Sequence, residues 1–348
     1  MSAVIQVEHL RKVYGPVIAV DALSFEVEQG EIFGMVGPNG AGKTSTVECI
    51  EGLRAASGGT IRVLGMDPQS EKYRVRPHIG VQLQESALQA RLKVWEALDL
   101  FASFYARSVN QVALLEQVGL TEKRNARFAK LSGGQKQRLF IALALVHDPE
   151  IVFLDELTTG LDPQARRAMW EMVRGMRERG KTVFLITHSM EEAERLCDRV
   201  AIVDQGRIVA LDSPHHLVSN LGADNRVVFT VDGMPDLQCL QALQEVSDIQ
   251  QVEDRLVISG KGDGDALLSS VVTALPASGI RYHDLHTERP TLEDVFLKVT
   301  GRRALCQIRV SRPSWARCSS SSCSTSQARR YHSRFTRRRC SRLPSLFH

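Results

Sequence analysis

The chain has 348 residues, 43% of them hydrophobic and 24% charged, which is ordinary for about two packed domains. No apolar stretch approaches the ~18 residues of a membrane span, and the first eight residues lack a secretory signal, so we expect a cytoplasmic protein. The net charge of +4 is uneven, because residues 302–348 hold twelve Arg and no acidic residue, and removing those charges leaves −8 on residues 1–301. An acidic body argues against nucleic acid as the main partner.

The first quarter of the chain is predicted to hold strands that lead into a Gly-rich loop. Residues 3–7 and 17–27 mix apolar and polar residues as half-exposed strands do, residues 31–36 form a further strand, and a helix follows over 43–53. Between this strand and the helix lies the segment Gly37-Pro38-Asn39-Gly40-Ala41-Gly42-Lys43-Thr44-Ser45.

This segment matches the phosphate-binding pattern G-x-x-x-x-G-K-[ST], and it occupies the strand-to-helix position that the pattern requires. The glycines let successive N–H groups turn toward one anion, and the helix N-terminus adds positive potential. Lys43 would reach the β and γ phosphates, and the Thr44 hydroxyl would ligate Mg²⁺. Residues 37–45 are therefore the predicted ATP-binding loop.

A mostly helical stretch follows a short strand at 79–83 and runs over residues 92–147. Inside it, Leu131-Ser132-Gly133-Gly134-Gln135 precedes a helix over 136–146. A Ser followed by two glycines at a helix start can bind an anion. The chain thus has two candidate phosphate sites, the second made by Ser132, Gly133, Gly134 and Gln135.

Two apolar runs, residues 151–154 and 182–187, are predicted to be buried parallel strands, with a helix over 163–179 between them. The first run ends in Asp155 and Glu156, at the kind of strand end where α/β sheets place ligands. Asp155 would hold Mg²⁺ through its water shell, and Glu156 would orient and deprotonate the attacking water. The alternative is a solvated strand end without chemistry.

The string Leu-Ser-Gly-Gly-Gln is the signature of the ABC ATPase family, and residues 3–214 resemble that family in the order of their parts. The resemblance implies that Tyr14 stacks on adenine, that Gln84 contacts the metal and the attacking water, and that His188 contacts the γ-phosphate. Alternatives stay open: Tyr14 could be a packing residue, Gln82 could take the role of Gln84, and His188 could be structural.

The resemblance also implies partners. ATP would lie between the loop of one chain and the signature of another, so that a homodimer or a paired ABC subunit would form the two sites. A separate transmembrane permease would hold the chain at the cytoplasmic face of the cell membrane, with no nucleic acid partner. The permease would contact residues 86–104, where Trp95, Phe101 and Phe104 are either that contact or part of a local core.

One departure from the family narrows the resemblance. Leu157 follows Glu156 where most relatives have Pro, and with the ending Thr291-Leu292-Glu293-Asp294-Val295-Phe296 it resembles the daunorubicin-resistance type of ABC exporter ATPase. The implied function is an ATPase subunit that powers export of a drug, lipid or polysaccharide. A soluble ABC ATPase acting on nucleic acid or the ribosome is the alternative, disfavoured because only 89 residues separate Lys43 from Ser132.

The predicted fold is an α/β P-loop NTPase of the ABC nucleotide-binding type over residues 1–214, with an α/β core, an antiparallel β flank and a helical lobe at about 85–150. Residues 222–301 are predicted to form a small accessory α+β domain with ferredoxin-like element order, including helices over 236–246 and 292–299. Residues 302–348 are Arg- and Ser-rich and predicted to be disordered. A basic arm for lipid or nucleic acid and a frameshift product are the other interpretations of that tail.

Overall fold

A six-stranded sheet forms the centre of the first 220 residues in the computed structural model, which describes residues 2–82, 87–220, 225–231, 237–260, 264–277 and 280–301. In the order in which they lie side by side, the strands are β5 (Ile79–Gln82), β6 (Ile151–Asp155), β7 (Thr182–Thr187), β3 (Ile32–Val36), β8 (Arg199–Asp204) and β9 (Arg207–Asp212). All pairings from β5 to β8 are parallel, and β8 and β9 form an antiparallel hairpin. The carboxyl ends of β3, β6 and β7 therefore meet at one edge.

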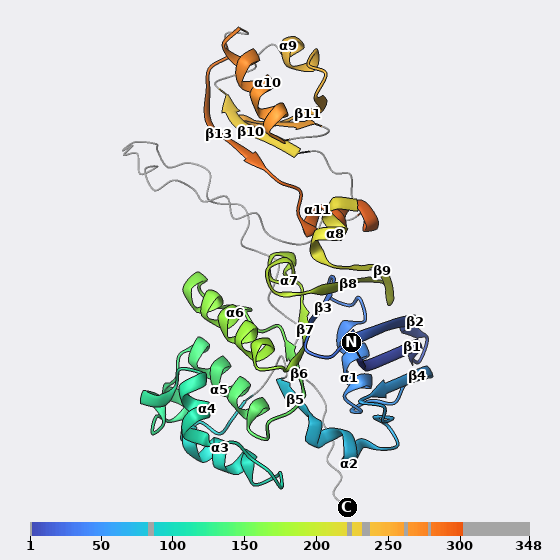
Figure 1. Ribbon diagram of the computed structural model, residues 1–348, viewed down its shortest axis with the longest axis vertical. Helices are drawn as coiled ribbons and strands as arrows, with labels where there is room; N and C mark the ends of the chain where they lie inside the picture. The colour runs from blue at the N-terminus through green and yellow to red at the C-terminus, as the bar shows by residue number, and fades with distance from the viewer. Residues whose placement is uncertain are drawn as a thin grey trace, which may run out of the picture. The chain divides into compact units, whose positions relative to one another are not determined.

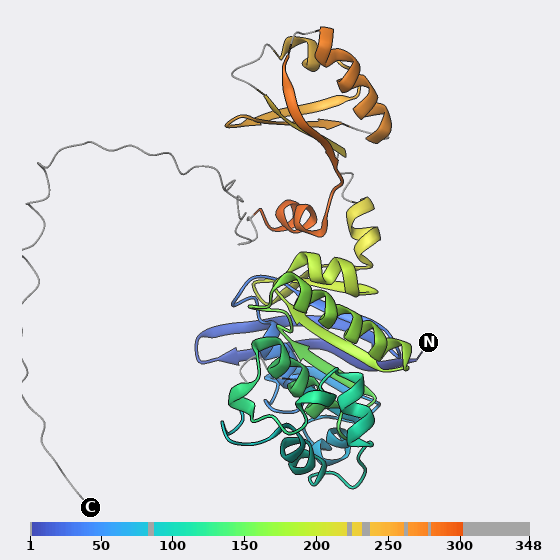
Figure 2. The same ribbon diagram turned by 90° about the vertical axis from the view of Figure 1, so that its left-hand side faces the viewer.

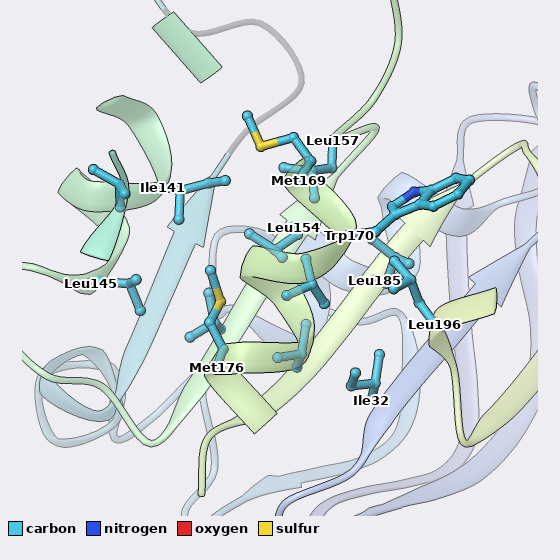
Figure 3. Close-up of a cluster of buried hydrophobic side chains, with 14 of the residues drawn as sticks. Ile32, Ile141, Leu145, Leu154, Leu157, Met169, Trp170, Met176, Leu185 and Leu196 are labelled. Atoms are coloured by element: carbon cyan, nitrogen blue, oxygen red, sulfur yellow. The ribbon is translucent and has the colours of Figure 1, made fainter. Parts of the chain in front are cut away.

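Side chains of these strands alternate between two hydrophobic clusters, one on each face of the sheet. In β6, Val152 and Leu154 belong to the cluster packed against the helices, whereas Ile151 and Phe153 belong to the opposite one. Figure 3 shows Leu154 in the first cluster with Met176 beside it. Burial on both faces explains why these strands are continuous apolar runs in the sequence.

Helices cover one face and an antiparallel sheet the other (Figures 1 and 2). The first face carries α3 (Val94–Ala102), α4 (Gln111–Gln117), η2 (Thr121–Lys123), η3 (Phe128–Lys130), α5 (Gly133–Leu145), α6 (Pro163–Glu178) and α7 (Met190–Leu196). The other carries α1 (Lys43–Ile50), α2 (Lys72–Val75), η1 (Arg76–His78) and the sheet β2-β1-β4, formed by β1 (Ala3–Tyr14), β2 (Val17–Glu28) and β4 (Gly58–Val63). The predicted fold class is confirmed.

A second, four-stranded antiparallel sheet lies later in the chain and has its own hydrophobic cluster. Its elements are β10 (Asn225–Val231), α9 (Gln238–Gln241), β11 (Val246–Val252), β12 (Arg255–Gly260), α10 (Gly264–Ala277) and β13 (Tyr282–Glu288). The order β11-β12-β10-β13 is that of the predicted ferredoxin-like unit. The helix predicted over 236–246 was too long, because pairing with β12 takes Val246 into a strand and the chain turns at Leu243.

The last described helix, α11 (Leu292–Thr300), packs on the first part of the chain. Leu292, Val295 and Phe296 belong to the cluster that the six-stranded sheet shares with α7, and the Leu292 N–H donates to Glu194 Oε2 at 3.2 Å. Helix α8 (Pro214–Asn220) contacts α11 as well. The sequence assigned α11 to the accessory domain, but its apolar face is buried elsewhere because the small sheet's own cluster does not include it. Residues 302–348 lie outside the described residues.

Over the described ranges, no helix combines the length and the apolar character needed to cross a membrane.

Candidate nucleotide-binding and catalytic site

The Gly-rich loop between β3 and α1 is held in a conformation that only glycine accommodates. Gly37 has φ +156° and Gly42, the N-cap of α1, has φ +100°. A Cβ at Gly37 would lie 2.1 Å from the Val203 carbonyl oxygen, and one at Gly42 would lie 2.3 Å from that of Ala19. By contrast, no heavy atom lies within 4 Å of the Cβ position at Gly40, so this part of the loop faces open space.

Lys43, the first residue of α1, folds back over the loop. Its Nζ donates to the carbonyl oxygens of Gly37 at 2.8 Å and Pro38 at 3.0 Å, and its side chain is buried. Burial lowers the pKa of Lys43, while the nearby carboxylates of Glu156 and Asp155 act in the opposite direction. The two carboxylates therefore favour the charged form of the buried Lys43 ammonium group beside the loop.

Asp155 and Glu156 follow one another at the carboxyl end of β6. Burial raises the pKa of Asp155 to about 6, the charge of Glu156 adds to this effect, and Lys43 opposes it. Glu156 has φ +48°, a left-handed backbone conformation that is uncommon for a non-glycine residue. A cation between these carboxylates would favour their ionised forms, which is what a divalent metal supplies.

Two neighbours orient the Glu156 carboxylate. His188, directly after β7, has its Nδ1 3.1 Å from Glu156 Oε1, and the Thr159 hydroxyl donates to Oε2 at 3.3 Å. Because β6 and β7 are adjacent parallel strands, their ends bring these residues together from 32 positions apart. The predicted residues Lys43, Asp155, Glu156 and His188 thus lie at one edge of the sheet.

The signature segment starts helix α5. The Ser132 hydroxyl accepts from the Gln135 N–H at 3.3 Å, and the Gln135 side chain accepts from the Ser132 N–H at 3.0 Å, which forms a capping box. A Cβ at Gly133 would meet no heavy atom within 4 Å, and Gly134 approaches Ala165 and Leu161. Within the described parts of the chain, no hydrogen bond joins residues 132–135 to the loop at 37–44.

Tyr14 lies at the end of β1 beside the loop helix. Its hydroxyl is 3.4 Å from Ser45 Oγ, and Lys12 Nζ and the Arg54 guanidinium lie 4.9 and 5.7 Å from the ring centroid. Tyr14 is 37% exposed, so part of the ring is accessible to a ligand. Gln84 lies outside the described residues, and Gln82 is buried at the end of β5.

Glu51 is a buried carboxyl group, within the electrostatic influence of Asp155, that the sequence analysis did not identify. It follows the last residue of α1, is 5% exposed, and has its pKa raised to about 8 by burial and by the negative charges of Asp155 and Glu48. The electrostatic effect of Asp155 connects it with the metal-type carboxylates. The one feature of the sequence that could have indicated Glu51 is the position of a Glu at the apolar end of this helix.

The site combines a phosphate-type loop after β3 with a carboxylate pair at the end of β6, two strands away in the sheet. Together with a parallel sheet that has an antiparallel flank, these features define a nucleotide-binding α/β protein. The ABC transporter family matches residues 20–159. The chain is 41% identical to the Nod factor export ATP-binding protein I of Paraburkholderia xenovorans over 86% of this chain and 98% of that protein. It is 37% identical to the linearmycin resistance ATP-binding protein LnrL of Bacillus subtilis, again over 86% and 98%.

Solved structures give the same result. An ATP-binding subunit of an ABC transporter superimposes with a TM-score of 0.58 at 28% identity, covering 63% of this chain and 93% of that one. The chain therefore belongs to the ABC transporter family, and it is an ATP-binding, ATP-hydrolysing subunit related to exporter ATPases. At the departure from the family pattern, the Leu157 side chain is buried in the cluster with Met169 (Figure 3).

Proposed function

We propose that the chain powers a separate transmembrane permease by hydrolysing Mg²⁺-ATP, and that two chains share each ATP. The observation that carries the proposal is the convergence of Lys43, Asp155, Glu156 and His188 beside the loop. The loop's N–H groups and the ammonium of Lys43 would bind the phosphates, with Ser45 and Tyr14 at the adenosine side.

Glu156 would take the proton of the attacking water, because its carboxylate is oriented by His188 and Thr159. His188, which is about half exposed, would also reach the γ-phosphate. Asp155 and Thr44 would hold Mg²⁺, which supplies charge neutralisation at the phosphates. Burial raises the pKa of Asp155, and a divalent cation beside it would favour the ionised form that binds metal. The sequence-based metal role of Gln84 remains a prediction.

The dimer is supported by the exposed glycine at the start of α5, which leaves Ser132–Gln135 open toward a second chain's phosphates. A bacterial ABC transporter cassette solved as a dimer is 25% identical with a TM-score of 0.54 over 60% of this chain and 98% of that one. The charge of the γ-phosphate would then be shared between Lys43 of one chain and the α5 N-terminus of the other.

Mixing two inactive variants tests the shared site. Lys43→Ala removes the loop cation, and Ser132→Arg fills the signature. Each alone should fail to dimerise with ATP, whereas the mixture should form heterodimers, since one composite site is intact. Size-exclusion chromatography of the mixture with Mg²⁺-ATP, in chains that also carry Glu156→Gln, measures this. Monomers at every concentration would refute the shared site.

The permease is proposed from the names of the relatives, which are ATP-binding proteins of export and resistance systems. Its docking site would be a groove of about 780 Å³ whose wall includes Leu53, Tyr73, Phe101 and Phe104. Phe104 is 68% and Tyr73 76% exposed, so the groove wall presents large aromatic side chains to solvent. Phe101 also packs on the core, and Trp95 is not among the groove residues, so Phe104 is the aromatic that we propose for the permease contact.

A photo-reactive amino acid at position 104 tests this docking. In cells of the source organism it should crosslink to a multi-span membrane protein, and the crosslink should be absent when the group is placed at exposed Val112 of α4. Crosslinks confined to residues 225–288 would place the contact elsewhere. The cargo, for which drug, lipid and polysaccharide are the classes proposed, would be identified by stimulation of ATPase activity in that complex.

A further inference from the structure

Among the described residues that line the groove proposed for the permease, one side chain is acidic and most are apolar or aromatic. Glu51 contributes to this wall together with Leu53, Val81 and Phe140, and the remaining polar groups are Tyr, Arg, Gln and His side chains. Gly52 fixes the position of Glu51, because it has φ +71° and a Cβ there would lie 2.2 Å from the Pro68 carbonyl oxygen. The carboxyl is therefore held at the groove by the backbone on its C-terminal side.

Glu51 is largely buried in the groove wall. The residue is 5% exposed, and among the residues that the structure describes its carboxyl accepts no hydrogen bond and forms no ion pair. It also stands at the C-terminal end of α1, where the helix dipole is negative, and feels the negative charges of Asp155 and Glu48. All these surroundings favour the arrival of a positive charge.

Two basic side chains, Arg76 and His147, are among the described residues that line the groove, and neither forms an ion pair with Glu51. The exposed Arg76 has its guanidinium 5.7 Å from the Tyr73 ring centroid. Burial lowers the pKa of His147, whose Nε2 donates to the Ile79 carbonyl oxygen at 3.0 Å and whose ring stacks on Tyr105. A neutral imidazole does not supply the charge that Glu51 lacks.

We propose that Glu51 receives a Lys or Arg side chain of the permease segment that docks in the groove. This inference rests on the proposed function, and it specifies the chemistry of the partner: a short amphipathic segment with apolar or aromatic residues for the groove wall and one basic residue directed at Glu51. An ion pair in this position is largely desolvated, so it would contribute strongly to binding specificity. The raised pKa of Glu51 is the condition expected before the cation arrives.

Charge reversal on both sides tests the pair. The chain is purified with the membrane protein that crosslinks at position 104, and the crosslinked segment of that protein supplies the basic residues to be changed to Glu. Glu51→Arg should weaken retention of the membrane protein by about 30-fold or more, as expected for breaking one side of a buried charge pair. One Lys→Glu or Arg→Glu change in the segment should do the same, and the two together should restore binding to within about threefold of wild type.

Glu51→Gln, which has nearly the same shape, should weaken retention in the same direction and guards against misfolding of the Arg variant. Glu150→Gln, an exposed carboxylate paired with His78, is the matched control and should retain the membrane protein as wild type does. If position 104 crosslinks to the membrane protein but neither Glu51 variant changes retention, or no basic residue gives rescue, the pair does not exist while the docking proposal stands. If position 104 crosslinks to no membrane protein, the docking proposal fails and the pair with it.

Discussion

The two ends of helix α1 differ in how far the chain itself satisfies their charged side chains. At the N-terminus, Lys43 donates to two loop carbonyls and lies in the field of two carboxylates. At the C-terminus, Glu51 is equally buried, but its described surroundings add negative charge and provide no hydrogen bond. The first end is arranged before any ligand arrives, whereas at the second, burial favours the protonated form of Glu51 until something supplies a cation.

This difference suggests what each end is for. A catalytic site gains from groups that are already in place, because no reorganisation is then needed during reaction. A docking site that must report the presence of a partner gains from a group whose state changes on binding. Helix α1 has eight residues, so a single rigid element connects the two.

The largest effect on activity is expected at the nucleotide site, where the chain itself already satisfies the charged side chains. Glu156→Gln should leave ATP binding intact and lower turnover by about 10² to 10⁴, the range typical for loss of a general base. The Gln side chain can still interact with His188 and Thr159, so the geometry persists while the proton acceptor is lost. Phosphate release under saturating ATP measures the turnover, and Glu171→Gln on the exposed face of α6 is the control. Near-wild-type turnover would remove Glu156 from this role.

The next effect concerns Glu51, at the C-terminal end of α1, and it is a dependence of stability on pH. The folded chain keeps the Glu51 proton up to about pH 8, whereas the unfolded chain releases it near the ordinary value of 4.5. Stability from this group is therefore present below about pH 4.5 and is lost as the pH rises toward 8. Because each pKa unit corresponds to about 1.4 kcal/mol, the loss is at most about 5 kcal/mol.

Glu51→Gln does not titrate, so it should become more stable than the wild type as the pH rises from 5 to 9. Urea unfolding of both proteins at several pH values measures the difference. Asp155 titrates in the same direction near pH 6, but it is present in both proteins and cancels in the comparison. A stability difference that is independent of pH would show that Glu51 is ionised in the folded chain, and the contrast between the two ends of α1 would disappear.

Of the two ends of α1, the sequence predicts only the chemistry of the N-terminal, nucleotide-binding end. The loop, Asp155-Glu156 and the signature are local strings whose position after a strand or before a helix already implies their chemistry, and the apolar runs gave β6 and β7. Glu51 could not be identified, because its burial depends on β5 and the lobe closing over it. The same holds for α11, whose apolar face was readable, whereas the surface that buries it, on α7 and α8, lies about 70 to 100 residues earlier.

The third prediction addresses Lys43. Lys43→Ala should weaken ATP binding on the order of 100-fold, because hydrogen bonds to a charged group contribute about 1.5–3 kcal/mol. The loop also loses the hydrogen bonds that Lys43 donates to its carbonyl oxygens. Calorimetric titration with ATP measures the affinity. Lys43→Met, which keeps most of the apolar stem, should behave like the Ala variant, because the charge is what matters. Unchanged affinity in both would mean that the loop binds phosphate through its N–H groups alone.

The smallest effect is expected at Tyr14, where two explanations make different predictions. If the ring stacks on adenine, Tyr14→Ala should weaken ATP binding by about tenfold, within the 1–3 kcal/mol typical of a base on an aromatic ring. If instead the ring only holds Lys12 and Arg54 in place, the variant acts through charge near the phosphates.

Tripolyphosphate separates these explanations, because it presents the phosphates without the base. Stacking predicts that Tyr14→Ala loses affinity for ATP but keeps its affinity for tripolyphosphate. Tyr14→Phe retains the ring and gives up only the 3.4 Å contact with Ser45, so its ATP affinity should stay within about twofold of wild type. Equal losses for ATP and tripolyphosphate in Tyr14→Ala would show that the residue supports α1 and its cations rather than the base. The Tyr14 ring would then have no ligand. The N-terminal, nucleotide-binding end of α1 would depend on contacts from outside the loop, as the Glu51 end depends on a partner.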